Sequence, residues 1–316
     1  MFRLLAGPAE GRRPDSPEPA LPPVPASERE ADVLVVGSGA AAFSAAITAK
    51  RRGASVIMLE KGPAVGGTTI RSGGGFWVPN NRFQRALGIE DRKEDALRYM
   101  ARYSYPHLYN PQDPRLGLPQ NEYELMETVY ERASEMVEFL GDSQALDSIQ
   151  EINWMGRPQV DYMDHLPENK GIRGRVLYAK NPEGKQSYGF ELVRQLEQWA
   201  RANGIKIMPD HQVIRILRND AGEVVGLEVV RQRTEITYFR ARRAVIFGSG
   251  GYSHNPGFML RFQRGPHFGG CSAPTNTGDF ITMASELGVQ LGNMAGAFRA
   301  ESLFENVLDQ PDGSNN

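Results

Sequence analysis

Small residues and one acid between residues 33 and 60 have the spacing of a site for a phosphate-bearing ligand. Gly37 and Gly39 let the backbone turn sharply and approach a pyrophosphate, and Ala42 keeps the third small position, where a helix packs on a strand. An acid about 20 residues after the first glycine, here Glu60, accepts hydrogen bonds from ribose hydroxyls. This spacing predicts a dinucleotide site. Because an acid repels a 2′-phosphate, the sequence leaves NAD or FAD.

The segments around these residues have the pattern of a strand, a helix and a second strand. Residues 33–36 form a continuous apolar run, typical of a parallel strand buried on both faces. A helix over residues 40–52, ended by Gly53, would point its N-terminal amides at the phosphates. Residues 55–59 form the second strand, which leads into Glu60. These parts fall in register, which favours a ligand-binding βαβ unit over one without a ligand.

A second glycine-rich stretch, over residues 66–75, decides between the two cofactors. It holds five glycines and three hydroxyl side chains. Because an interior glycine costs about 1 kcal/mol relative to alanine, we expect no helix here and assign the glycines to close backbone approach. A loop just after the ribose-binding acid can follow the ribityl chain and ring of a flavin, which favours FAD. The alternative, a flexible surface loop, agrees poorly with Phe76, Trp77 and Val78, which we expect to be buried.

Further elements follow from periodicity and turn residues. Helices are predicted over residues 94–103, 122–140, 189–203 and 279–287, and strands over residues 205–208, 212–218, 224–232, 235–239 and 244–247. The strands from 205 to 239 read as one strand followed by a meander of antiparallel strands.

Four segments resemble the flavoprotein subunits of the fumarate reductase and succinate dehydrogenase superfamily. They read GSGAAAF, LEKGPAVGGTTIRSGGGFWVPNN, AVIFGSGGYSHN and NTGDFITMASELGVQLGNM, and the wording SGGGFWVPNN is most similar to 3-ketosteroid Δ1-dehydrogenases. The resemblance runs from about residue 32 to 294. It implies an α/β fold, with a Rossmann-like FAD-binding domain of the glutathione-reductase type that contains a parallel sheet, a β-meander and a helical insertion. No histidine lies in residues 66–75, where members with covalent flavin carry one, so the resemblance implies noncovalent FAD.

The resemblance also implies which residues bind the cofactor. In the family, the meander covers the adenine end of FAD, with the backbone near Val213 against the base. Thr277 and Asp279 have an alternative role as helix caps. The predicted cofactor-binding residues are Gly37, Ser38, Gly39, Ala40, Ala41, Glu60, Lys61, Gly66, Gly67, Thr68, Thr69, Ser72, Gly73, Gly74, Gly75, Val213, Ser249, Gly250, Gly251, Asn276, Thr277, Gly278 and Asp279.

The predicted reaction is dehydrogenation of adjacent carbons next to a carbonyl, with hydride passing to flavin N5 and a tyrosine as acid or base. Residues 160–168, continuing to Arg175, resemble the ketosteroid dehydrogenase segment that carries a catalytic tyrosine, so Tyr162 is the candidate. Two extra residues before Pro167 leave a partly buried packing role as the alternative. A fumarate-type reductase would instead clamp carboxylates with arginines. We expect Arg173 and Arg175 to be solvated charges.

Composition limits the remaining possibilities. A chain of 316 residues with 40% hydrophobic residues can bury a core, and a net charge of −2 argues against nucleic-acid binding. No stretch has the ~20 apolar residues of a membrane span. The single cysteine, Cys271, fits a reducing cytoplasm, and five scattered histidines indicate no metal site. The expected partner is a small hydrophobic ketone or enone, and the sequence identifies no electron acceptor.

Three segments are expected along the chain. Residues 1–30 hold seven prolines and read as a disordered tail. Residues 31–292 form the FAD-binding domain, with a helical excursion over about 82–180. Residues 293–316 read as the start of a capping domain that the resemblance implies and that is largely absent. The alternatives are therefore an oxidoreductase, either a dehydrogenase or a fumarate reductase-like reductase of enones or dicarboxylates, and a non-catalytic FAD-binding fragment.

Overall fold

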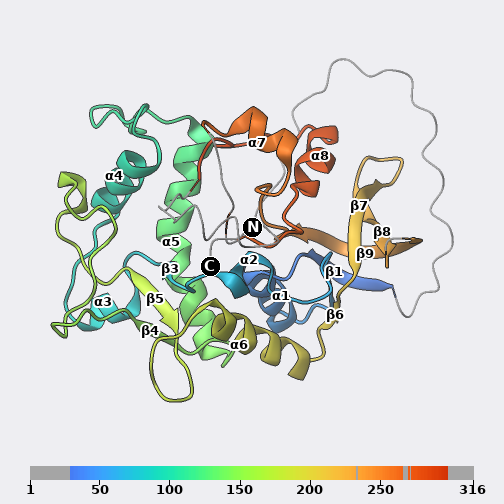
Figure 1. Ribbon diagram of the computed structural model, residues 1–316, viewed down its shortest axis with the longest axis horizontal. Coiled ribbons are helices and arrows are strands. Elements are labelled where there is room, and N and C mark those ends of the chain that lie inside the picture. Colours follow the sequence, from blue (N-terminus) through green and yellow to red (C-terminus); the bar gives the residue numbers. More distant parts are fainter. Residues whose placement is uncertain (1–28, 233, 266–269, 271, 298–316) are drawn as a thin grey trace, which may run out of the picture. The chain divides into compact units, whose positions relative to one another are not determined.

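The computed structural model describes residues 29–232, 234–265, 270 and 272–297 (Figure 1). Most of the predicted tail, Cys271 and most of the predicted capping segment lie outside these residues. The chain divides into two compact units, which we name by their sheets. The six-stranded unit comprises the described residues up to Thr68 together with Arg201–Leu291, and the three-stranded unit comprises Thr69–Ala200 with the described residues from Gly292 onward. The domain boundaries expected from the sequence remain a prediction.

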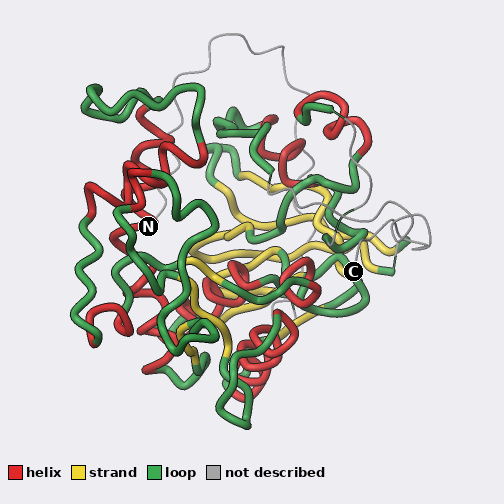
Figure 2. Tube along the Cα trace, turned by 60° about the vertical axis from the view of Figure 1, so that its left-hand side comes forward, coloured by secondary structure: helices red, strands yellow, loops and turns green. Residues whose placement is uncertain are grey.

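The six-stranded unit is built on one mixed sheet whose strands run side by side (Figure 2). The strand order is β6-β2-β1-β9-β8-β7, in which β6, β2, β1 and β9 are parallel and β7 and β8 are antiparallel to their neighbours. The strands are β1 (Glu30–Val36), β2 (Val56–Leu59), β6 (Lys206–Met208), β7 (His211–Arg218), β8 (Val224–Arg231) and β9 (Glu235–Phe247). The predicted α/β fold, with a parallel sheet and a β-meander, is confirmed.

The long strand β9 differs from the expectation of two separate strands. Its first part pairs antiparallel with β8, and its second part pairs parallel with β1. Three arginines near its middle interrupt the apolar pattern and suggest a break. One of them, Arg242, forms ion pairs of 2.8 Å with Glu30 and 3.0 Å with Asp32. Both acids belong to the neighbouring strand β1, so the arginine is paired within the sheet and β9 continues past it.

Two predicted helices of the six-stranded unit, at residues 40–52 and 279–287, form with nearly the expected ends. The helix α1 (Ala40–Arg51) buries Ala42, Phe43, Ala46 and Ile47, and it contacts β1, β2 and β9. The helix α8 (Asp279–Glu286) contacts β7, and α7 (Pro256–Phe262) lies between β9 and α8 in the chain. The short helix α2 (Gly67–Arg71) contradicts the expectation of a helix-free stretch at residues 66–75. Its interior holds no glycine, because Gly67 is its first residue and the glycine run at 73–75 follows its end.

The three-stranded unit combines helices with a small antiparallel sheet that sequence periodicity did not indicate. The sheet order is β3-β5-β4, from β3 (Phe76–Trp77), β5 (Val176–Ala179) and β4 (Ser148–Gln150). The helices are α3 (Arg82–Ala86), α4 (Lys93–Ser104), α5 (Gln120–Asp142), the short 3₁₀ helix η1 (Pro167–Asn169) and α6 (Gly189–Ala202), whose last two residues are assigned to the six-stranded unit. These strands have two to four residues, which is too few to show the alternation of apolar and polar side chains that predicts a strand. Val78, Val137 and Leu177 form part of the core.

Candidate functional site: a dinucleotide turn and a buried arginine cluster

The turn between β1 and α1 is closed by backbone groups that leave no room for side chains. Gly37 has φ +99°, and a Cβ there would lie 2.5 Å from the Gly248 oxygen. A Cβ on Gly248 would in turn lie 2.7 Å from the Ala42 nitrogen. The amide of Gly248 also donates to the Val36 oxygen at 2.8 Å. The loops after β1 and β9 therefore meet as bare backbone at the carboxyl ends of the parallel strands.

The N-terminus of α1 fits an anionic ligand. Its N-cap residue is Gly39, which supplies no side-chain cap, and its first turn contains no acid. The first amides of a helix have no partner within the helix and carry the positive end of its dipole. This end therefore suits the pyrophosphate of a dinucleotide, the group for which the sequence predicts it.

Glu60 is held at the end of β2 by two hydrogen bonds. The side chain is buried, and its Oε2 accepts from the Ser38 hydroxyl at 2.5 Å, while Oε1 accepts from the Gly62 amide at 2.7 Å. The Ser38 oxygen itself accepts from the Gly66 amide at 2.9 Å. Because each carboxylate oxygen can accept a further hydrogen bond, the anchored Glu60 keeps acceptor capacity for hydroxyl groups.

A second cluster joins β2, β7 and the start of α8. Lys61 Nζ lies 3.0 Å from Asp279 Oδ2, and the Thr277 hydroxyl and Gln212 amide donate to the same carboxylate at 2.6 Å and 2.8 Å. Burial raises the pKa of Asp279, but the hydrogen bonds from Thr277 and Lys61 outweigh it and leave the pKa below its usual value. The helix-cap alternative is wrong, because the N-cap of α8 is Gly278 and no side chain caps that helix.

The other predicted cofactor-binding positions differ in the space around them, and a Cβ on Gly67 would meet no atom within 4 Å. A Cβ on Gly250 would lie 2.6 Å from Asn276 Oδ1, and Val213 is buried in β7, paired with Val229. The six-stranded unit brings together Gly37, Ser38, Gly39, Ala40, Ala41, Glu60, Lys61, Gly66, Gly67, Thr68, Val213, Ser249, Gly250, Gly251, Asn276, Thr277, Gly278 and Asp279, whereas Thr69, Ser72, Gly73, Gly74, Gly75 and Tyr162 belong to the three-stranded unit.

Two residues of the glycine loop, by which we mean residues 73–75, are closely packed, whereas a Cβ on Gly73 would meet no atom within 4 Å. A Cβ on Gly74 would lie 2.5 Å from the Gly189 nitrogen, and a Cβ on Gly75 would lie 3.1 Å from the ring of Tyr178. The amide of Gly189 donates to the Ser72 oxygen at 3.0 Å. The loop therefore lies directly against the start of α6. Trp77 and Phe76, which we expected to be buried, are only half-buried, whereas Val78 is buried.

Tyr162 is 77% exposed, which contradicts the partly buried packing role that was its alternative. The residue before it, Asp161, is buried. Tyr162 therefore combines an exposed side chain with a buried neighbour on the same segment. The catalytic role of Tyr162 remains a prediction.

The expectation of a solvated Arg175 is wrong, because this side chain is fully buried between two aspartates. Its Nε and Nη2 donate to Asp91 at 2.9 Å and 2.8 Å, and its Nη1 donates to Asp161 at 2.6 Å. The guanidinium also lies 5.3 Å from the ring centre of Trp77 and 5.2 Å from that of Tyr99. Burial lowers the pKa of Arg175, but its bonds to Asp91 and Asp161 raise it above its usual value. We call Asp91, Asp161 and Arg175 the buried arginine cluster.

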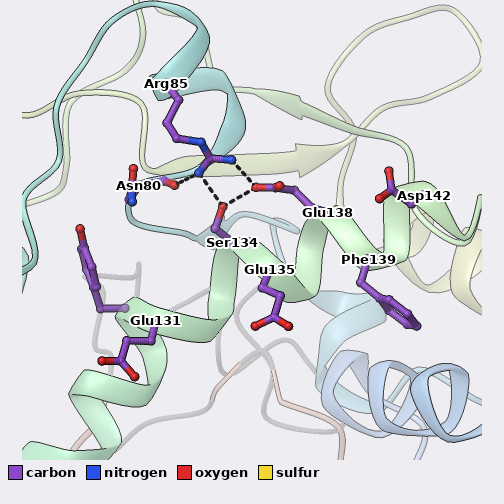
Figure 3. A pocket seen from close by; sticks show the side chains of 9 residues that line it. Asn80, Arg85, Glu131, Ser134, Glu135, Glu138, Phe139 and Asp142 are labelled. Atoms are coloured by element: carbon purple, nitrogen blue, oxygen red, sulfur yellow. Dashed lines mark hydrogen bonds and ion pairs between the residues drawn. The ribbon is translucent and has the colours of Figure 1, made fainter. Parts of the chain in front are cut away.

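The buried arginine cluster was not predicted. Asp161 and Arg175 lie in the segment that resembles ketosteroid dehydrogenases, but no spacing or motif links Asp91 to them. A hollow of about 570 Å³ along α5 is a different feature (Figure 3). In it, Arg85 reaches Ser134 at 3.2 Å and Glu138 at 2.6 Å. None of the predicted site residues lines it, so it is not the candidate site.

Within the described residues, no group of His, Cys, Asp or Glu is arranged to hold a metal ion. No described helix is long and apolar enough to cross a membrane.

Comparison with known proteins shows which proteins this chain is similar to. The chain is 30% identical to a 3-oxosteroid 1-dehydrogenase of Mycolicibacterium smegmatis, over 85% of this chain and 56% of that protein. It is 29% identical to a probable fumarate reductase of Shewanella frigidimarina, over 82% of this chain and 39% of that protein. The chain therefore spans about half the length, or less, of these relatives.

A solved structure shows the same fold. The 3-ketosteroid-Δ4-(5α)-dehydrogenase of Rhodococcus jostii matches with a TM-score of 0.66 and 25% identity, over 86% of this chain and 56% of that one. Residues 32–300 match the family described as FAD binding domain, which confirms the cofactor predicted from the glycine motifs and Glu60. The chain belongs to the family of FAD-binding domains found in these flavoproteins.

Proposed function

We propose that this chain supplies the FAD-binding part of an oxidoreductase that dehydrogenates adjacent carbons of a small hydrophobic ketone. The observation that carries the proposal is Tyr162, an exposed phenol on an anchored segment of the unit that also holds the glycine loop. The relative named a 3-oxosteroid 1-dehydrogenase supports a ketosteroid-like substrate. FAD, when bound, supplies the acceptor for the hydride.

The residues of this chain would divide the remaining work. The backbone of Gly37 and Gly39 and the first amides of α1 would hold the pyrophosphate, and Glu60 would accept the ribose hydroxyls. The glycine loop would let the backbone approach the flavin ring. Tyr162 would exchange a proton with the substrate, because a phenol both donates and accepts a hydrogen bond.

A fumarate-type mechanism receives less support from the structure. Such an enzyme would hold a substrate carboxylate with arginines. Arg175 already binds two aspartates and is fully buried, so it is not available to a substrate. The half-buried Arg173 is engaged with the Pro158 oxygen through a long 3.4 Å contact.

The test begins with the purified chain, incubated with FAD and desalted, whose visible absorption reports retained flavin. A protein that keeps its flavin is then assayed with a 3-oxosteroid and an artificial electron acceptor, beside the Tyr162→Phe variant. We expect retained flavin, turnover in the wild type and a large loss in the variant. Flavin retention without turnover would support a non-catalytic FAD-binding fragment, and equal turnover in both proteins would exclude Tyr162 as the acid or base.

A further inference from the structure

Tyr162 lies between two residues that are fixed to different parts of the three-stranded unit. On one side, the Asp161 carboxylate accepts from Arg175 at 2.6 Å, Asn169 at 3.0 Å and the Trp77 indole at 3.1 Å. On the other side, the backbone of Met163 hydrogen-bonds the hydroxyl of Tyr99. The exposed phenol is therefore attached to a short segment whose two ends are fixed.

Two of the three partners of Asp161, Trp77 and Arg175, belong to or directly adjoin the small sheet that begins at the glycine loop, and the third, Asn169, lies in η1. Trp77 belongs to β3, which directly follows residues 73–75. Arg175 directly precedes β5, the strand that pairs with β3 through Phe76–Leu177 and Trp77–Val176. A backbone bridge between Val160 and Arg173 adds a further connection. The segment with Tyr162 is thus joined to the glycine loop through two hydrogen bonds of a single carboxylate.

Asp91 determines how Arg175 presents its remaining donor. It binds Nε and Nη2 together, which fixes the plane of the guanidinium and leaves Nη1 directed at Asp161. The rings of Trp77 and Tyr99 lie over this group. Lysine offers a point charge without a planar fork, so it cannot reproduce the arrangement.

We propose that Arg175 and Asp161 are positioning residues, which fix Tyr162 relative to the glycine loop. The use of Tyr162 in proton transfer rests on the proposed function, whereas its fixation does not. A cluster that only stabilises the unit has no reason to join the residue next to an exposed tyrosine to the strand that follows the glycine loop. The geometry also separates the two aspartates. Asp161 is the direct chain neighbour of Tyr162, whereas Asp91 binds Arg175 and the Asn80 amide but no residue of the tyrosine segment.

The first experiment measures the mobility of Tyr162 without requiring activity. A fluorotyrosine is incorporated at position 162 alone in the full chain, and its ¹⁹F relaxation is compared in wild type, Asp161→Asn, Asp91→Asn and Arg175→Lys. Each aspartate variant removes one carboxylate from Arg175, so the two are matched controls. We expect faster motion of the ring in Asp161→Asn and Arg175→Lys and a smaller increase in Asp91→Asn, because Asp91 reaches the Tyr162 segment only through Arg175.

Wild-type relaxation in both Asp161→Asn and Arg175→Lys would overturn the proposal, as would equal changes in the two aspartate variants. Circular dichroism shows which variants fold. Should Asp161→Asn or Arg175→Lys not fold, Trp77→Phe takes its place. Trp77→Phe removes the indole hydrogen bond to Asp161. The proposal then requires that the Tyr162 ring move faster in Trp77→Phe than in the wild type.

The second experiment connects the cluster to turnover in the FAD-loaded chain. A misplaced catalytic group costs roughly 10-fold to 100-fold in rate, so we expect Arg175→Lys to lower kcat by that factor with KM changed less than about twofold. Equal losses of kcat in Asp91→Asn and Asp161→Asn would contradict the proposal. If Tyr162→Phe turns over like the wild type, the proposed function fails, while the ¹⁹F relaxation still decides whether the cluster fixes Tyr162.

Discussion

Replacing Arg175 by methionine should destabilise the three-stranded unit more than any surface ion-pair change. The substitution removes the partner of two carboxylates, Asp91 and Asp161, which are 3% and 4% exposed. Breaking a buried ion pair from one side costs about 3–5 kcal/mol, because an uncompensated charge stays in the interior. Small domains have a free energy of unfolding of about 5–15 kcal/mol, so this loss is a large share of the total.

An exposed arginine of the same unit provides the control. The Arg85–Glu138 pair has side-chain exposures of 44% and 35%, and such surface pairs contribute about 0.2–1 kcal/mol. Arg85→Met should therefore cost about 1 kcal/mol or less. Combining Arg175→Met with Asp91→Asn and Asp161→Asn should recover much of the loss, because the buried charges are then removed together.

Tryptophan fluorescence during urea unfolding measures these differences. All three tryptophans, Trp77, Trp154 and Trp199, lie in the three-stranded unit, so the signal reports the unit that holds Arg175. A loss below 1 kcal/mol, or no larger than that of Arg85→Met, would refute the electrostatic reasoning.

The remaining predictions concern the six-stranded unit. Gly37→Ala should abolish retention of FAD on desalting, whereas Gly53→Ala should keep it, because both glycines have positive φ but only the first would place a Cβ 2.5 Å from backbone oxygen; equal retention would contradict this. Ser38→Ala should lower the free energy of unfolding by about 1–3 kcal/mol in urea, since it leaves the Gly66 amide and a carboxylate oxygen without their buried partner. Asp279→Asn should cost about 1 kcal/mol at pH 7. Because the pKa of Asp279 is lowered in the folded protein, the ionised side chain stabilises the fold above about pH 4, and this contribution disappears as the pH falls through the lower folded value. The free energies of unfolding of variant and wild type should therefore approach one another as the pH is lowered below about 4.

The amino-acid sequence alone determined the local part of this protein. The apolar run of β1, the GxGxxA spacing and Glu60 all fall within about one βαβ unit, where chain neighbours are also neighbours in space. The same locality explains why FAD was predictable and why α1, α5 and α8 have nearly the predicted ends. The errors in this part are small. Helix α2 forms because glycines lie only at its margins, and β9 continues because acids of β1 pair with Arg242.

Only the tertiary structure decided where Arg175 lies and what surrounds Tyr162. Asp91 lies 84 residues before Arg175 and Asp161 lies 14 residues before it. Each of these residues, taken alone, is a charged side chain of the kind that is usually exposed. Their burial depends on strands of two to four residues, which are too short to show a period. A buried charge is tolerated only with partners in defined geometry, and that geometry comes from packing between distant segments. For this reason the spacing of residues revealed the cofactor, whereas the support of the candidate catalytic tyrosine appeared only in the folded chain.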